Sequence, residues 1–269
     1  MSETMLEIKD VHKAFNPGTI NEKIALDGVN LTLEKGDFVT VIGGNGAGKS
    51  TMLNAIAGVW PIDSGSIRIG DTNVTGLPAF KRAALVGRVF QDPMTGTAAT
   101  MQIEENMALA LRRGKPRSPF KPGVTHKERE SFREKLKILD LGLEDRLTAK
   151  VGLLSGGQRQ ALTLLMATLQ MPKILLLDEH TAALDPKTAE KVLAATEKVV
   201  SKDNLTTLMI THNMKDAIAH GNRLIMMNEG KVILDIRGEE KAKLTVEDLL
   251  HKFSSVSGEE FASDKVLLS

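Results

Sequence analysis

The sequence predicts an α/β fold with a mixed sheet core, an antiparallel flank and an inserted helical subdomain. Three observations lead to this class. Short β-branched runs alternate with helical patterns at both ends of the chain, a glycine-rich loop joins one such run to a helix, and the middle of the chain is mainly helical in character. We therefore expect an α/β core over residues 1–91 and 172–240, a helical subdomain over 92–171, and a C-terminal helix with a tail over 241–269.

The composition limits the class of protein. The 269 residues carry 35 Lys and Arg against 34 Asp and Glu, so no overall positive charge favours nucleic acid as a partner. The absence of cysteine excludes disulfides and thiolate metal sites. The first nine residues lack the apolar region of a signal peptide, and the apolar stretch 161–171 is broken by polar residues and too short to span a bilayer. We expect a protein that is soluble, or that reaches a membrane through a partner.

The N-terminal part has the character of the antiparallel flank. Residues 5–11 predict an edge strand and residues 24–33 predict another, separated by turn-forming residues at 16–19. Further strands are expected over 66–69 and 86–90.

Residues 43–51 fit the pattern G-x-x-x-x-G-K-[ST] and lie between a strand-like run and a helical one. Glycines allow successive backbone N–H groups to point inward at a triphosphate, with a helix N-terminus adding positive charge. A chance glycine-rich turn is the alternative, but the strand and helix on either side favour a nucleotide site. Lys49 would reach the β- and γ-phosphates, and the Ser50 hydroxyl would bind Mg²⁺. The predicted nucleotide-binding residues of the loop are Gly43, Gly44, Asn45, Gly46, Ala47, Gly48, Lys49, Ser50 and Thr51.

The helical subdomain is expected to contain helices over 104–111 and 127–139. The second of these segments carries one apolar stripe, which begins with Phe132, Leu136 and Leu139 and continues to Leu143 just beyond it. The basic segment 112–121, with Pro116 and Pro119, is expected to be a solvated loop rather than a contact with anionic lipid or a partner.

Strands and helices alternate again in the C-terminal part. Asp185 is a suitable N-cap for a helix that begins at Pro186. A last amphipathic helix and a polar tail are expected over 245–253 and 254–269. The other expected elements are strands over 174–177, 207–211, 224–227 and 231–235 and helices over 186–202 and 214–220.

Two carboxylates follow the apolar strand 174–177 directly. A buried parallel strand delivers such residues to the ligand-bearing edge of a sheet. Asp178 suits Mg²⁺, and Glu179 suits general-base work on an attacking water. In isolation the pattern also describes a solvated turn, but the phosphate-binding loop in the same chain favours a catalytic role.

The sequence Leu-Ser-Gly-Gly-Gln at 154–158 is the second strong motif. Ser155 is a plausible N-cap for the following helix, so a hydroxyl and free N–H groups gather at a helix start. With this motif the chain resembles the nucleotide-binding subunit of ABC transporters over about residues 6–235, since L-S-G-G-Q is the signature of that family. The resemblance implies the ABC type of P-loop NTPase fold, with ATP and Mg²⁺ as cofactors.

The resemblance also assigns roles to residues that match the family's other motifs. Gln91 resembles the glutamine that contacts Mg²⁺ and water and senses the membrane subunit. His212 resembles the histidine that bonds the γ-phosphate, and Asp185 lies in the loop that crosses the dimer interface. Phe15 stands where the family stacks an aromatic ring on adenine, with a core phenylalanine as the alternative.

The mechanism implied by the family is a head-to-tail dimer of two copies. Each ATP lies between Lys49 of one chain and the signature of the other, so that Ser155, Gly156, Gly157 and Gln158 complete the site in trans. Glu179 acts on the water, while Lys49 and His212 stabilise charge on the transferred phosphoryl group.

Integral membrane permease subunits, and through them a substrate-binding protein, are the other implied partners, on the cytoplasmic face of the cell membrane. Import of a small solute such as an amino acid is the leading expectation. An ABC exporter subunit, a soluble ABC ATPase acting on DNA or the ribosome, and a small-molecule kinase are the alternatives. The soluble ATPases usually carry long coiled coils or two tandem ATP sites, and a kinase has no use for the signature.

The chain departs from the family pattern at three places. His180 stands where most relatives have proline, and residues 161–168 lack the arginine common after the signature. The segment 92–101, which follows Gln91, is also unusual and is where a partner's coupling helix would dock. The methionines that would suit such docking are Met94, Met101 and Met107, although core packing is the more common fate of a methionine.

Overall fold

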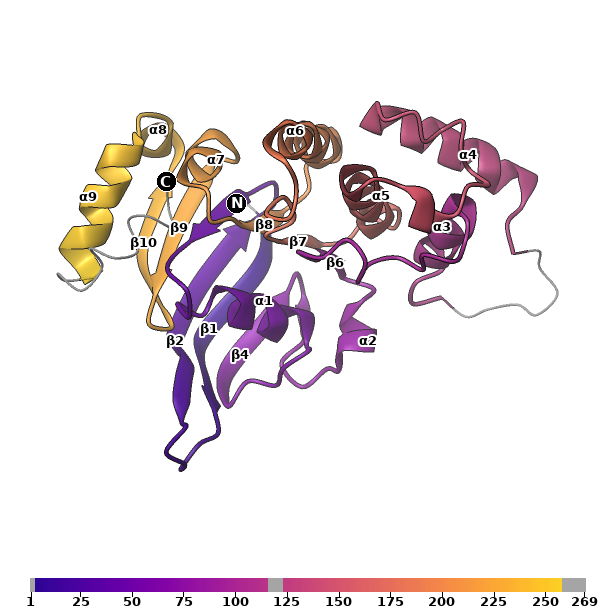
Figure 1. The fold of residues 1–269 in the computed structure, drawn as a ribbon. Coiled ribbons are helices and arrows are strands. Elements are labelled where there is room, and N and C mark those ends of the chain that lie inside the picture. Colours follow the sequence, from indigo (N-terminus) through magenta and orange to yellow (C-terminus); the bar gives the residue numbers. More distant parts are fainter. Residues whose placement is uncertain (1–2, 116–122, 258–269) are drawn as a thin grey trace. The chain divides into compact units, whose positions relative to one another are not determined.

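The computed structural model describes residues 3–115 and 123–257 (Figure 1). They belong to two compact units. The first unit comes from Met1–Arg82 and Thr206–Ser269, and the second from Ala83–Leu205. The predicted solvated loop around Pro116 and Pro119 and most of the predicted tail, residues 258–269, lie outside the described residues.

An antiparallel sheet forms one layer of the first unit. Its strand order is β2-β1-β4-β5, and β1 pairs with both β2 and β4. The prediction that residues 5–11 form an edge strand is therefore wrong, because the partner β4 comes more than fifty residues later in the chain and no local pattern reveals it. The strands are β1 (Thr4–Phe15), β2 (Lys23–Glu34), β4 (Ser64–Ile69) and β5 (Thr72–Asn73).

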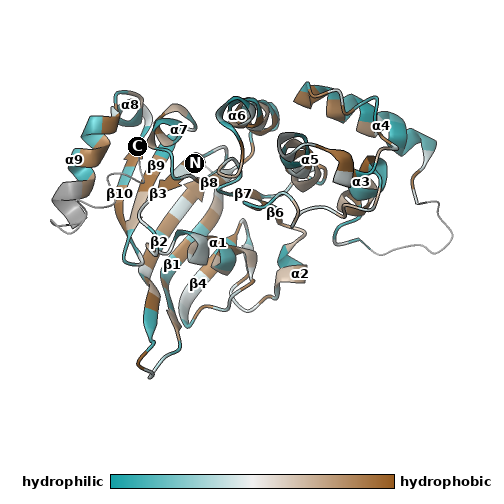
Figure 2. Cartoon of the chain, viewed as in Figure 1, coloured by the Kyte–Doolittle hydropathy of each residue, from teal (hydrophilic) through white to brown (hydrophobic). Residues whose placement is uncertain are grey.

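A second, mixed sheet in the same unit carries the phosphate-loop strand β3. This strand runs parallel to β8 and β9, and β10 pairs with β9 in the antiparallel sense. Every residue of β3 and β8 is buried, as parallel strands covered on both faces require. The strands are β3 (Phe38–Ile42), β8 (Thr207–Ile210), β9 (Arg223–Asn228) and β10 (Lys231–Arg237). The predicted α/β class, with a mixed sheet and an antiparallel flank, is confirmed. Figure 2 shows hydrophobic residues along the strands, whereas helices such as α4 carry hydrophilic stretches.

The C-terminal helices are fixed to this sheet by apolar packing and by one buried lysine. Met214, Leu224, Ile236, Leu249 and Phe253 belong to a common buried cluster. The Lys241 ammonium donates to the carbonyl oxygens of Ile218 at 3.1 Å, Gly221 at 2.9 Å and His220, and so satisfies the end of α7. Burial lowers the pKa of Lys241 to about 8.

The helices of the first unit include two that the sequence did not predict. A single turn has too few residues for a helical period to be recognised, and both α2 and α8 are of this kind. The helices are α1 (Lys49–Ala57), α2 (Ala79–Arg82), α7 (Met214–Ala219), α8 (Gly238–Ala242) and α9 (Val246–Ser257).

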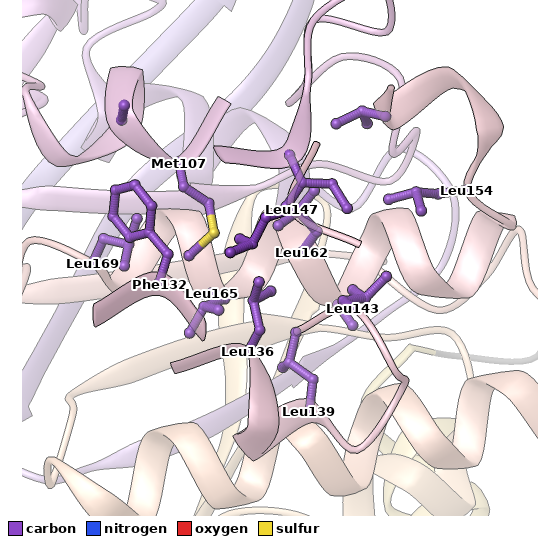
Figure 3. Close-up of a cluster of buried hydrophobic side chains, with 14 of the residues drawn as sticks. Met107, Phe132, Leu136, Leu139, Leu143, Leu147, Leu154, Leu162, Leu165 and Leu169 are labelled. Carbon is purple, nitrogen blue, oxygen red and sulfur yellow. The ribbon is translucent and has the colours of Figure 1, made fainter. Parts of the chain in front are cut away.

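The second unit contains the parallel pair β6 (Val86–Val89) and β7 (Ile174–Asp178) together with a helical core. The predicted apolar stripe from Phe132 to Leu143 is buried in that core, beside Met107 and Leu165 (Figure 3). Its helices are α3 (Ile103–Leu111), α4 (His126–Leu136), α5 (Gly156–Thr168) and α6 (Pro186–Lys202), with 3₁₀ turns η1 (Lys137–Leu139) and η2 (Val151–Leu153). Every helix within residues 3–115 and 123–257 is too short or too polar to span a bilayer.

Candidate functional site

The phosphate loop of the first unit connects the end of β3 to the start of α1. Gly43 and Gly48 have φ values of 149° and 99°. A Cβ atom at Gly43 would lie 2.2 Å from the Met227 carbonyl oxygen, and one at Gly48 would lie 2.4 Å from the Ala25 carbonyl oxygen. Both positions therefore require glycine for conformation and for space.

Lys49 is buried within this loop. Its ammonium donates to the carbonyl oxygens of Gly43 at 2.7 Å and Gly44 at 3.0 Å. Helix α1 has no side-chain cap and no acidic residue in its first turn, so its positive end is left to an external anion. Asn45, Gly46 and Ser50 are exposed. A curled backbone, a buried cation and an uncapped helix start fit the triphosphate of a nucleotide.

Gly48→Ala is expected to weaken nucleotide binding at least about tenfold, because the added methyl group collides with backbone and the residue adopts a strained φ. Equilibrium binding of ATP measures this effect. Gly18→Ala is the matched control, since Gly18 also has a positive φ of 74° but a Cβ there meets nothing within 4 Å. Equal losses in both variants would show that backbone strain alone, and not the shape of the loop, is responsible.

Phe15 ends β1 and is half-buried. Its ring packs edge-to-face against Trp60, with ring centroids 5.0 Å apart. Lys13 lies 5.8 Å from the ring centroid and is held by Asp63 at 2.7 Å. The predicted adenine platform is thus supported by defined neighbours, and because Trp60 is the single tryptophan of the chain, its fluorescence reports on this region.

Lys23 is a residue of this region that the sequence did not single out. The β1–β2 register pairs Lys23 with Phe15, and the Lys23 ammonium would lie 3.1 Å from a Cβ atom at Gly46. A second cation therefore lies beside the phosphate loop. No fixed motif spacing could have revealed it, because the register of two strands determines its place.

His212 lies two residues after the end of β8 and is half-buried. The following residue, Asn213, caps α7 by accepting from the backbone N–H groups of Lys215 at 2.9 Å and Asp216 at 3.3 Å. This cap fixes the backbone on the C-terminal side of His212.

In the second unit, Asp178 and Glu179 lie at the end of β7, as predicted. The four residues before them are fully buried, and the Asp178 side chain forms an ion pair with Arg88 at 3.0 Å. Glu179 has a φ of 47°, which is unusual for a residue with a side chain. Strained backbone of this kind clusters at functional sites, so the turn that presents Glu179 is a candidate catalytic element.

Gln91 is exposed and follows β6 in the same unit. The carbonyl oxygen of its neighbour Phe90 accepts from the Gln160 amide of α5 at 2.9 Å. The segment that follows is also attached to α5, because Arg159 contacts the Met94 sulfur and Gly96 packs on Thr163.

The three methionines of interest have different surroundings. Met94 is 53% exposed, Met107 is fully buried in the core, and Met101 lines a surface cavity. Core packing therefore explains the methionine at position 107, but not those at positions 94 and 101.

The signature residues form the start of α5. Ser155 is the N-cap, and its hydroxyl accepts from the Gln158 N–H at 3.3 Å while the Gln158 side chain accepts from the Ser155 N–H at 3.2 Å. Ser155 and Gly156 are exposed. Gly157 is needed for close packing, because a Cβ atom there would lie 2.0 Å from the Thr188 methyl carbon of α6. The predicted cap is confirmed, and Gly157 allows the two helix starts to approach.

Asp185 and His180 both connect the segment after β7 to helix α6. Asp185 is the N-cap of α6, as predicted, and hydrogen bonds from Thr188 lower the pKa of its carboxyl. His180 is buried, with Nε2 3.1 Å from the Thr196 hydroxyl of α6. This hydrogen bond ties the turn after Glu179 to α6, which gives a histidine at position 180 a structural role.

The predicted site residues are divided between the units. Phe15, residues 43–51 and His212 belong to the first unit; Gln91, residues 155–158, Asp178, Glu179 and Asp185 belong to the second. Over residues 3–115 and 123–257, no group of three or more His, Asp or Glu side chains is arranged to hold a metal ion by itself. Ser50, Gln91 and Asp178 offer oxygen donors, which is the ligand chemistry that Mg²⁺ prefers.

Comparison with known proteins agrees with these motifs. The chain is 47% identical over 254 residues to the tyrosine transport ATP-binding protein of Clostridioides difficile, covering 93% of this chain and 98% of that protein. It is 32% identical over 235 residues to a spermidine/putrescine import ATP-binding protein of Haemophilus influenzae, covering 87% of this chain but spanning only 58% of that protein. The dimeric post-hydrolysis state of an ATP-binding cassette bound to ADP and Pi has a TM-score of 0.73 and 31% identity, covering 87% of this chain and 98% of that one.

The family profile described as ABC transporter matches residues 26–182, a range that includes the phosphate loop, the signature and both carboxylates. More than half of the chain is matched, and the relatives just described extend the similarity over most of the remainder. The chain therefore belongs to the ABC transporter family, as an ATP-binding subunit that hydrolyses ATP.

Proposed function

We propose that this chain powers the import of an amino acid, most simply an aromatic one, through separate membrane subunits. The observation that supports this solute is the 47% identity to a tyrosine transport ATP-binding protein over nearly the full length of both chains. The relative at 32% identity is an import protein for polyamines, so the direction of transport is supported more broadly than the solute.

The first unit supplies the groups that hold the nucleotide. The backbone N–H groups of residues 43–51 and the Lys49 ammonium bind the phosphates, with Lys23 as an additional cation beside Gly46. Phe15 stacks on the adenine ring, and Trp60 keeps its ring in place. His212 donates to the γ-phosphate.

Mg²⁺ would be held by Ser50, Gln91 and Asp178. When bound, it neutralises charge on the phosphate oxygens and so favours phosphoryl transfer. Glu179 orients and deprotonates the attacking water, and its turn, tied to α6 through His180, holds the carboxylate in one position. Gln91 also orients this water.

A second copy of the chain completes the site. We propose a head-to-tail dimer in which Ser155, Gly156 and Gln158 of the partner contact the γ-phosphate and Asp185 lies at the interface. A solved relative with 31% identity is a dimer bound to ADP and Pi, which supports this assembly. Loss of the γ-phosphate would remove the contact that holds the two copies together.

The membrane permease would contact the second unit, on the cytoplasmic face of the membrane. A cavity of about 320 Å³ lies on this unit, lined among others by Met101, Ala108 and Leu109. Leu109 is 41% exposed, and the acids and arginines around it suit the polar ends of a short amphipathic helix. A substrate-binding protein would join through the permease.

The test of this function is reconstitution. The tagged chain is purified from detergent-solubilised membranes with its integral membrane partner, placed in proteoliposomes with ATP, and assayed for movement of labelled tyrosine, phenylalanine, methionine and spermidine. We expect ATP-dependent import of the aromatic amino acids. Import of spermidine or methionine alone would overturn the solute, and ATP-driven export would establish the alternative of an exporter. Co-purification with DNA or ribosomes in place of a membrane protein would establish the soluble alternative.

A further inference from the structure

Arg88 pairs with the first of the two carboxylates at the end of β7. Its guanidinium nitrogen Nη2 lies 3.0 Å from Asp178 Oδ2, and both side chains are only 14% exposed. A charge-assisted hydrogen bond with this little exposure is screened weakly by solvent and salt. The pair is therefore a defined part of the site and not a surface contact.

The strand β6 places Arg88 there. Strands β6 and β7 run parallel, with Arg88 in register with Leu176, two residues before Asp178. The guanidinium carbon lies 4.6 Å from the centroid of the Phe90 ring, so stacking orients the cation from another side. Arg88 is held by its own strand, by Phe90 and by the carboxylate.

The pairing has a direct consequence for a divalent cation at Asp178. A carboxylate that already accepts from a guanidinium offers less negative potential to a second cation, and two cations close to one carboxylate repel each other. We propose that Arg88 is a positioning residue that holds the Asp178 carboxylate when no divalent cation is bound and must release it when one binds. This proposal rests on the function proposed above, in which Asp178 is a Mg²⁺ ligand.

The same contacts extend beyond Asp178. Phe90, on which Arg88 stacks, is joined through its carbonyl oxygen to Gln160 of α5, the helix that begins with the signature. Gln160 is fully buried, so this link is protected from water. A movement of Arg88 on release of Asp178 would therefore change the contacts of Phe90, the residue before Gln91, and of α5, all within the second unit.

The experiment measures how much Mg²⁺ strengthens nucleotide binding. A non-hydrolysable ATP analogue is titrated into the full chain by calorimetry, once in EDTA and once in excess Mg²⁺. The readout is the dissociation constant in EDTA divided by the dissociation constant in Mg²⁺. Arg88→Met removes the charge but keeps an apolar stem, and we expect it to raise this ratio about tenfold. Arg88→Lys keeps the charge and is expected to leave the ratio close to that of the parent chain.

Arg133→Met is the control, because Arg133 forms an ion pair with Glu130 at 2.6 Å elsewhere in the same unit. It should not change the ratio. An unchanged or smaller ratio in Arg88→Met would overturn the proposal, as would a ratio in Arg88→Lys as high as that in Arg88→Met. If Arg88→Met does not fold by circular dichroism, Arg88→Gln replaces it with the same expectation. Failure of the parent chain to bind the analogue in either condition would count against the proposed function, not against Arg88.

Discussion

Glu179→Gln is expected to reduce ATP hydrolysis by about 10²–10⁴-fold while leaving ATP affinity close to that of the parent chain. Glutamine matches glutamate in shape and occupies the same positive-φ position, so the comparison isolates the carboxylate. The reason for the loss is that an amide cannot accept the proton of the attacking water. Single-turnover hydrolysis and equilibrium binding of ATP measure the two quantities separately.

Glu190→Gln provides the control for this variant. Glu190 is an exposed residue of α6, so the change removes one negative charge from the same unit without touching the turn after β7. It should hydrolyse ATP at the parent rate. Hydrolysis by Glu179→Gln at the parent rate would mean that another group acts as the base.

Ser155→Arg is expected to abolish hydrolysis while ATP binding by the isolated chain stays nearly unchanged. A long cationic side chain at this exposed N-cap would fill the space that the partner's nucleotide needs. The variant also loses the capping hydrogen bond to Gln158, which contributes about 1 kcal/mol to stability. ATPase assays, binding measurements and thermal unfolding together separate these effects.

Two further variants at the same position separate occlusion from capping. Ser155→Asn keeps a good N-cap with little added bulk, and Ser155→Ala removes the cap without bulk. We expect Ser155→Asn to match the parent in stability and Ser155→Ala to be less stable, with both retaining more hydrolysis than Ser155→Arg. Loss of ATP binding in Ser155→Arg would show that the signature serves the nucleotide of its own chain.

Long periodic elements could be predicted closely from the sequence. The helix α6 has the predicted bounds, Pro186–Lys202, because Asp185 and Pro186 mark its start and a clear apolar stripe follows. The expected helix over 127–139 is also present, although its last turn tightens into η1. In both helices, the apolar periodicity of the segment itself, joined in α6 by the capping residues, was sufficient to predict the element.

Features that depend on distant pairing could not be predicted. The central place of β1 depends on β4, the position of Lys23 depends on the β1–β2 register, and that of Arg88 depends on the pairing of β6 with β7. His180 is similar, since its partner Thr196 lies 16 residues further along the chain, on α6. Motifs predicted the chemical groups of the site, whereas tertiary pairing determines the residues that support them.

The claim that ATP joins two copies of this chain is tested most directly by the mass of Glu179→Gln in solution with ATP and Mg²⁺. We predict a species of twice the 29.2 kDa chain mass with ATP and of a single chain with ADP, measured by light scattering after size exclusion. Adding Ser155→Arg to this variant should return the single-chain mass while ATP remains bound. A Glu179→Gln chain that binds ATP and stays at the mass of one copy would contradict the shared site.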